Sequence, residues 1–237
     1  MQHAIDQQRS FAIAYDADLV DKPGVELFSP ELWRSRQALD GEAVGRGSTW
    51  FVNAPFGPVV LREYLRGGWV AKMSRKHYFF TTVARSRPFR EFDILAALYG
   101  QGLPVPQPVA ALCEHSGLVS SGSIITMRIA HTRTLADVLP GDLQHGDVLW
   151  DNVGRCIRQF HRAGVWHADL NARNIVLNEE LSVFLVDFDR ARLMSGTEVK
   201  GKRNLERLKR SLEKLWPAGQ RNLLQPAWNH LLAAYHA

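Results

Sequence analysis

The feature that most constrains this chain is an ordered series of polar residues in its last third. His167, Asp169 and Asn174 lie in one continuous stretch, HADLNARN, which follows a long amphipathic segment that ends at Gly164. Two short apolar segments come next, and Asp187 stands directly behind the second of them. Short apolar strands form a frame that holds adjoining polar loop residues in fixed positions. The order therefore predicts one site that contains two carboxylates and an amide.

The stretch HADLNARN fits H-x-D-L-x-x-x-N, the catalytic-loop pattern of protein kinases, with its second residue changed. A carboxylate at the position of Asp169 can accept a hydroxyl proton and orient the nucleophile. Oxygen atoms of Asn174 and Asp187 are hard ligands that suit Mg²⁺, which neutralises charge between the transferring phosphates. An isolated D-x-x-x-x-N would be a weak signal, but the order of loop, strand, turn, strand and Asp-Phe-Asp is specific. We predict Asp169 as the catalytic base, with Asn174 and Asp187 as metal ligands.

The upstream half contains a glycine-rich stretch that resembles the phosphate loop G-x-G-x-x-G. Gly45, Arg46, Gly47 and Ser48 stand between strand-like segments, and Trp50 replaces the third glycine of the pattern. Two glycines still let backbone N–H groups approach phosphate oxygens. We predict that these four residues contact the nucleotide, although an ordinary hairpin turn would look similar.

The strand lysine of protein kinases is missing at its usual place. The apolar run before Arg62 leads to an arginine, which keeps the charge and can bind phosphate through two nitrogens. Glu91, on a helix predicted to begin at Arg87, is the expected ion-pair partner of Arg62. Lys72 is the alternative for this role, but its spacing from the glycine-rich stretch is long and it could equally be an exposed residue at a strand end. We therefore favour Arg62, paired with Glu91, as a residue of the active site.

Capping residues and periodicity predict the elements around these sites. Phe11–Tyr15 alternates weakly and is predicted as an edge strand. Ser29 followed by Pro30 marks a helix start, and that helix is expected to run to about Leu39. The other predicted elements are strands at 50–52, 59–64 and 69–72, a helix from Arg87 to Gly100, a strand pair at 109–113 and 123–129, a capped turn at 134–139, a helix over 147–163, short strands at 175–177 and 183–186, and helices to the end.

The first part of the chain is rich in strands and the second in helices. This order predicts an α+β, two-lobed protein-kinase-like fold, with a β-rich N-lobe over residues 1–130 and a small α-rich C-lobe over residues 131–237. Thr126, Met127 and Arg128 end the last N-lobe strand, where a kinase hinge receives adenine. We therefore predict that these three residues also contact ATP.

Positive charge is concentrated near the C-terminus. The chain has a formal net charge of +5, and residues 200–214 hold seven Lys or Arg and two Glu, so the remainder is neutral overall. Leu205, Leu208, Leu212 and Leu215 recur at helical spacing within this run. The pattern predicts a helix that packs its leucines on the core. Its charged face is expected to meet solvent, anionic lipid or an anionic substrate. The run lacks the interleaved aromatic residues of a nucleic-acid binder, so nucleic acid is not predicted as a partner.

The sequence also limits the compartment. No stretch is apolar over about 18 residues, and the first residues lack the features of a signal peptide. Cys113 and Cys156 form no metal-binding or redox motif, and they are expected to be buried free thiols in a reducing compartment. We expect the chain in the cytoplasm or facing it.

Taken together, the motifs resemble one family, the 3-deoxy-D-manno-octulosonic acid (Kdo) kinases of lipopolysaccharide core assembly. The resemblance runs from about Ser29 to Leu215. In that family an arginine also stands at the position of Arg62, and Asp-Phe-Asp replaces Asp-Phe-Gly. The segments that carry the resemblance are GRGSTWF, VLREYLRGG, RPFREFDIL, GLPVPQPVA, HADLNARN, DFDRAR and NLERLKRSLEK.

The resemblance implies a kinase-like fold, the cofactors ATP and Mg²⁺, and phosphorylation of the Kdo 4-hydroxyl in a Kdo–lipid A precursor. It also implies a peripheral protein on the cytoplasmic face of the inner membrane, in contact with the anionic membrane surface and with no obligate protein partner.

The same residues allow other assignments. Only 48 residues follow Asp189, and they contain no Ala-Pro-Glu, so we do not expect the helical platform that holds a peptide in protein kinases. A different small-molecule kinase, for heptose or of the aminoglycoside type, would use Asp169, Asn174 and Asp187 in the same way. A non-catalytic pseudokinase is disfavoured because all three of these residues are present.

Overall fold

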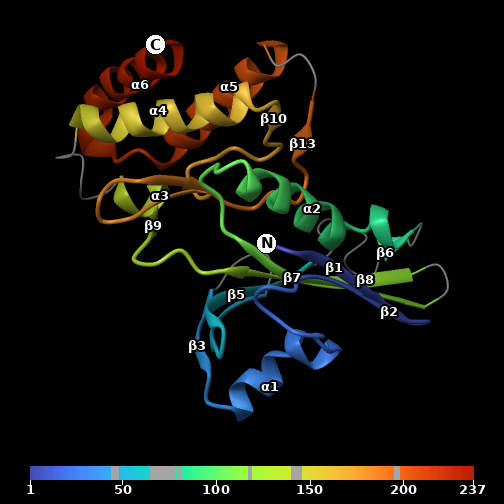
Figure 1. The fold of residues 1–237 in the computed structure, drawn as a ribbon. Coiled ribbons are helices and arrows are strands. Elements are labelled where there is room, and N and C mark those ends of the chain that lie inside the picture. The colour runs from blue at the N-terminus through green and yellow to red at the C-terminus, as the bar shows by residue number, and fades with distance from the viewer. Residues whose placement is uncertain (44–47, 65–77, 80–81, 117–118, 140–145, 195–197) are drawn as a thin grey trace. The chain divides into compact units, whose positions relative to one another are not determined.

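The computed structural model describes residues 1–43, 48–64, 78–79, 82–116, 119–139, 146–194 and 198–237 (Figure 1). These residues form two compact units. The first comprises residues 1–100 and 106–128, and the second comprises residues 101–105 and 129–237. The glycine-rich residues 45–47, the predicted strand at 69–72 and Lys72 lie outside the described residues.

In its described residues, the first unit is built on an eight-stranded antiparallel sheet in the order β1-β2-β7-β8-β5-β4-β3, with β6 paired to β8. Helices α1 and α2 lie on opposite sides of this sheet (Figure 1). The elements are β1 (His3–Gln7), β2 (Phe11–Asp16), a 3-10 turn (Val25–Phe28), α1 (Pro30–Ser35), β3 (Leu39–Ala43), β4 (Thr49–Ala54), β5 (Gly57–Glu63), β6 (Tyr78–Phe79), a 3-10 turn (Val83–Arg85), α2 (Arg87–Gly100), β7 (Pro108–Ser116) and β8 (Val119–Met127).

The start of α1 is as predicted, but its end is not. Ser29 caps the helix, and its Oγ accepts a hydrogen bond from the N–H of Leu32 at 3.3 Å. The prediction that the helix continues to about Leu39 is wrong, because α1 ends at Ser35 and Gln37 adopts a left-handed backbone with φ of 55°. That reversal lets Leu39 begin β3, where it pairs with Val52 of β4.

The predicted edge strand is an interior strand. Strand β2 lies between β1 and β7, and it buries Ala12, Ile13 and Ala14 completely. The edge is β1, whose one large apolar residue, Ile5, is exposed. A strand without an apolar face gives no alternation signal, which is why the sequence did not indicate it.

Helix α2 packs on β7 and β8 through a buried face that includes Phe92 and Leu95. The close approach depends on Gly122 of β8. A Cβ atom there would stand 2.6 Å from Cγ of Pro88 and 2.5 Å from the carbonyl oxygen of Leu112. This contact fixes the first turn of α2, directly before Glu91, against the sheet.

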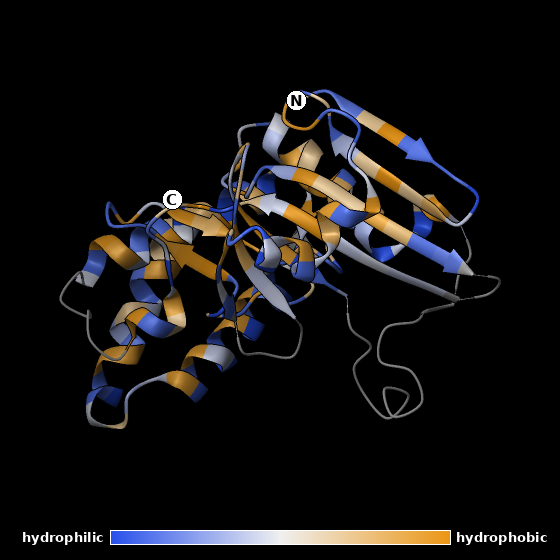
Figure 2. Cartoon of the chain, turned by 90° about the horizontal axis from the view of Figure 1, so that it is seen from below, coloured by the Kyte–Doolittle hydropathy of each residue, from blue (hydrophilic) through white to orange (hydrophobic). Residues whose placement is uncertain are grey.

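The second unit is mainly helical. Its elements are β9 (Arg133–Thr134), α3 (Leu135–Val138), α4 (Gly146–Arg162), β10 (Val165–Trp166), β11 (Ile175–Leu177), β12 (Val183–Leu185), β13 (Arg192–Leu193), α5 (Glu198–Leu215), a 3-10 turn (Ala218–Gln220) and α6 (Arg221–His236). Strands β12, β11 and β9 form one small sheet, and β10 pairs with β13. Along the helices, apolar and polar residues alternate in the pattern of amphipathic segments (Figure 2).

The leucine stripe of α5 faces the core as predicted. Leu205, Leu208 and Leu212 are all buried, and Leu208 is fully inaccessible. None of the described helices combines the length and apolar character needed to cross a bilayer. The two cysteines are buried and unpaired, which confirms the prediction of buried free thiols. Burial raises the pKa of Cys156 to about 12.

Candidate active site

The loop that contains Asp169 is held by the buried ring of His167. Its Nδ1 accepts a hydrogen bond from the backbone N–H of Asp169 at 3.3 Å, so the ring proton lies on Nε2. That nitrogen donates to the carbonyl oxygen of Val186 at 3.0 Å. Burial lowers the pKa of His167, which keeps this neutral form and therefore both bonds. The ring thus ties the loop to the residue directly before Asp187.

A second set of bonds aligns Asn174 with the same strand end. The backbone carbonyl of Asn174 accepts from the N–H of Val186 at 3.0 Å. The Asn174 side-chain Nδ2 donates to the carbonyl oxygen of Asp169 at 2.9 Å, so its other amide atom, Oδ1, is the one available as a ligand. Asn174 is therefore fixed both to the loop that contains Asp169 and to the strand that ends before Asp187.

Asp187 has an uncommon backbone conformation, with φ of 66°. Such a conformation in a residue other than glycine costs of order 1–3 kcal/mol and persists only when its surroundings hold it. The next residue, Phe188, is fully buried and packs against the rings of His167 and Phe160, at centroid distances of 4.9 and 5.8 Å. The strained backbone of Asp187 is thus held between two anchored neighbours, Val186 and Phe188.

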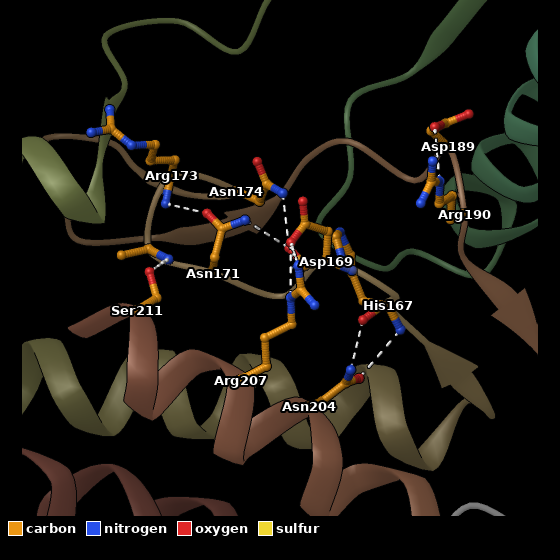
Figure 3. Close-up of polar contacts among 11 residues, drawn as sticks. His167, Asp169, Asn171, Arg173, Asn174, Asp189, Arg190, Asn204, Arg207 and Ser211 are labelled. Carbon is orange, nitrogen blue, oxygen red and sulfur yellow. Dashed lines mark hydrogen bonds and ion pairs between the residues drawn. The ribbon is translucent and has the colours of Figure 1, made fainter. Parts of the chain in front are cut away.

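The carboxylate of Asp169 has a partner that the sequence did not indicate. Arg207, on α5, donates from Nε to Oδ1 of Asp169 at 2.9 Å and from an Nη nitrogen to the same oxygen (Figure 3). Both side chains are about half exposed, at 48% and 49%. A residue of the basic run therefore lies at the predicted catalytic base.

Two more residues of α5 hold the backbone of this loop. Asn204 is buried; its Oδ1 accepts from the N–H of His167 at 3.2 Å, and its Nδ2 donates to the carbonyl of His167 at 2.6 Å. The Oγ of Ser211 accepts from the N–H of Ala172 at 3.2 Å. Asn204, Arg207 and Ser211 point from one face of the helix toward the loop (Figure 3).

Asn204 also connects the loop to α4. Its Oδ1 accepts from Nε2 of His161 at 3.1 Å, and Nδ1 of His161 accepts from the hydroxyl of Tyr235 at 2.9 Å. Burial is the main cause that lowers the pKa of His161. The loop backbone is thereby linked through Asn204 and His161 to α6.

In the first unit, Arg62 and Glu91 form the predicted ion pair. Leu61 faces the core beside Trp33, so the alternation of β5 turns Arg62 to the opposite face, toward α2. Arg62 donates to Oε2 of Glu91, and the hydroxyl of Tyr64 donates to the same oxygen. Glu91 is almost completely buried, whereas the Arg62 side chain is 23% exposed.

Tyr64 is a member of this site that sequence reasoning missed. It lies two residues after Arg62, so the strand alternation that turns Arg62 toward α2 was a signal that could have found it. The guanidinium of Arg62 lies 5.1 Å from the centre of the Tyr64 ring. The ring and its hydroxyl therefore fix both partners of the ion pair.

The predicted adenine contacts lie at the end of β8. Thr126 and Met127 pair with Val60 and Val59 of β5. The N–H of Met127 donates to the carbonyl of Gln107 at 2.8 Å. The N–H of Arg128 donates to the carbonyl of Pro58 at 2.9 Å, and its side chain pairs with Asp40 at 2.6 Å. A nucleotide bonded to either N–H would have to replace one of these two backbone hydrogen bonds.

The glycine-rich stretch is described only from Ser48 onward. The carbonyl oxygen of Ser48 accepts a hydrogen bond from the N–H of Glu63 at 3.0 Å. This bond joins the end of the stretch to β5 beside Arg62. Gly45, Arg46, Gly47 and the rival Lys72 lie outside the described residues, so their roles stay predictions.

Comparison with known proteins gives one consistent result. The family model described as "Lipopolysaccharide kinase (Kdo/WaaP) family" matches residues 30–235. A protein of Stenotrophomonas maltophilia (strain K279a), named 3-deoxy-D-manno-octulosonic acid kinase, is 42% identical over 228 residues, which cover 94% of this chain and 89% of that protein. Proteins of the same name from Xanthomonas euvesicatoria pv. vesicatoria (strain 85-10) and Xanthomonas campestris pv. campestris (strain B100) are 41% and 39% identical, over 86% and 94% of this chain and 81% and 89% of their own lengths.

Proposed function

The chain belongs to the lipopolysaccharide kinase (Kdo/WaaP) family, and we propose that it transfers the γ-phosphate of ATP to the 4-hydroxyl of the Kdo sugar in a Kdo–lipid A precursor. The observation that carries the proposal is the framework that fixes Asp169, Asn174 and Asp187 through His167 and Val186. The name of the relatives supplies the acceptor class, a sugar acid.

In this proposal Asp169 acts on the acceptor hydroxyl. Its carboxylate accepts the hydroxyl hydrogen bond and directs the oxygen at the γ-phosphorus. The new bond forms between that oxygen and phosphorus as the bond from phosphorus to the β–γ bridging oxygen breaks. The hydroxyl proton passes to Asp169, ADP leaves, and Asp169 later returns the proton to solvent.

The chemistry of Asn174 and Asp187 suits Mg²⁺. Oδ1 of Asn174 and the carboxylate of Asp187 are hard oxygen donors, and Mg²⁺ is commonly bound by one or two carboxylates together with substrate phosphates. When bound there, the ion would neutralise charge on the phosphates of ATP. The fixed amide of Asn174 and the constrained backbone of Asp187 support this assignment.

We assign nucleotide binding to residues of the first unit, acting as the N-lobe of a kinase. Arg62, oriented by Glu91 and Tyr64, would bind phosphate oxygens through its guanidinium group. Gly45, Arg46, Gly47 and Ser48 would cover the phosphates, and Thr126, Met127 and Arg128 would adjoin adenine.

We also propose that the exposed basic side of α5 contacts the cytoplasmic surface of the inner membrane, where a lipid-linked acceptor lies. Each Lys or Arg near an anionic surface contributes about 1 kcal/mol. Lys209 lies over the ring of Trp228, at 5.8 Å, so the best test reverses residues without such a contact. The set is Lys202, Arg203, Arg210 and Lys214, all of which are exposed.

Changing these four residues to Glu should reduce pelleting with anionic vesicles at low salt. It should raise KM for the lipid acceptor and leave the KM for ATP unchanged. The binding of the unmodified protein should fade near 1 M salt, where the Debye length is about 3 Å. Equal pelleting of both proteins would refute the membrane contact.

An acceptor panel tests the proposed reaction against its main alternative. The protein is incubated with labelled ATP and Mg²⁺ together with a Kdo–lipid A precursor, a heptose-containing acceptor or an aminoglycoside. Label should enter only the Kdo acceptor and only when Mg²⁺ is present. Label in heptose or aminoglycoside instead would establish the other small-molecule kinase.

A further inference from the structure

We propose that Arg207 recognises the carboxylate of the sugar-acid acceptor and thereby presents the acceptor hydroxyl to Asp169. This inference rests on the proposed function, which supplies an acceptor that carries a carboxylate beside its hydroxyls. It makes Arg207, a residue outside the kinase motifs, a determinant of acceptor specificity.

The geometry of the Arg207–Asp169 pair leaves each side chain able to form further hydrogen bonds. Arg207 directs Nε and one Nη nitrogen at a single oxygen of Asp169, Oδ1, so Oδ2 takes no part in these bonds. A guanidinium carries five N–H donors, and two of them serve Asp169. Both side chains are about half exposed, so a second carboxylate from solvent can reach the guanidinium. One arginine can then bridge Asp169 and the acceptor acid, with the hydroxyl next to Oδ2.

Arg207 is also better placed than an ordinary surface arginine. Asn204, one turn before it, and Ser211, one turn after it, both bond the backbone of the loop that contains Asp169. The helix and the loop are therefore fixed to each other on both sides of Arg207. Such support reduces the ordering cost of binding and gives the planar guanidinium a set orientation toward a carboxylate.

The charges that adjoin Arg207 favour an anionic acceptor. Arg203, Arg210 and Lys214 lie four residues before it and three and seven residues after it, a spacing that places all four cations in one stripe along α5. All three are exposed. A row of cations that includes the partner of Asp169 attracts acidic acceptors and disfavours polycations such as aminoglycosides.

The test compares the acid acceptor with its methyl ester, which removes the carboxylate charge and leaves the hydroxyls in place. Both acceptors are dispersed in neutral detergent, so that membrane binding does not enter. The unmodified protein should prefer the acid by about 10- to 100-fold in kcat/KM, the effect of one charged hydrogen-bonded contact. Arg207→Gln should use acid and ester equally well, and Arg207→Lys should show an intermediate preference.

The matched control is Arg221→Gln, which removes one exposed positive charge from the start of α6. It should retain the full preference for the acid. If Arg207→Gln is slow but keeps that preference, Arg207 merely positions Asp169 and the inference is wrong. If the unmodified protein uses both acceptors equally, the inference also fails while the proposed function stands. If it phosphorylates neither acceptor, the proposed function fails, and the inference fails with it.

Discussion

Replacing Asn204 by alanine should destabilise the protein strongly, because this one side chain satisfies three buried groups. They are the N–H and the carbonyl of His167 and Nε2–H of His161. A buried polar group that loses its partner costs about 1–3 kcal/mol. If the surrounding structure relaxes in part, losing the partner of three such groups should lower the free energy of unfolding by about 3–5 kcal/mol. That is a large part of the roughly 5–15 kcal/mol typical of a folded protein.

Urea denaturation followed by far-ultraviolet circular dichroism measures this loss. Asn222→Ala, an exposed asparagine on α6, is the matched control and should change the free energy of unfolding by less than about 0.5 kcal/mol. A loss below about 1 kcal/mol for Asn204→Ala would show that water or a neighbouring residue replaces its bonds. The account of how α5 holds the loop that contains Asp169 would then be wrong.

Three other predictions follow from the site. Asp169→Ala should lower kcat by roughly 10²–10⁴-fold and largely spare ATP binding, whereas near-normal turnover would remove Asp169 from the role of base. Arg62→Ala should raise KM for ATP and lower kcat, and Glu91→Ala should give a similar, smaller defect; unchanged kinetics in Arg62→Ala would contradict the assignment. Burial lowers the pKa of His167 from 6.5, so below that pH the unfolded chain binds more protons than the folded one and the free energy of unfolding should fall as pH falls. Urea titrations at about pH 7.5 and 5.5 measure this decrease in the free energy of unfolding, and the decrease should be smaller in His167→Asn.

Local patterns in the sequence predicted the elements that have strong end signals. Ser29 with Pro30 marked the start of α1, and Gly164, with φ of 77°, closes the turn after α4 as expected. The end of α1 depends on the pairing of Leu39 with β4, which is a contact between segments and leaves no local signal. The N-terminal strand was missed because Ile5 is its one large apolar residue.

The residues of the candidate site also differ in whether the sequence could predict them. The ion pair of Arg62 and Glu91 could be predicted because each residue stands at a motif position on its own element. Arg207 could not, since a basic residue in a charged helix is most simply read as solvated, and its place beside Asp169 depends on how α5 packs. Asn204 did leave a signal: it lies four residues before Leu208 and thus on the apolar side of α5, where a polar residue needs a partner.

The position of the phosphate on the product tests the central claim most directly. The product of ATP, Mg²⁺ and the Kdo–lipid A precursor is isolated, and phosphorus–proton correlation by NMR locates the new ester. We expect a single phosphate on the 4-hydroxyl of Kdo, and none with Asp169→Ala. A phosphate at another hydroxyl would contradict the proposed acceptor geometry. An unmodified acceptor in the presence of an intact, ATP-binding protein would contradict the proposed function itself.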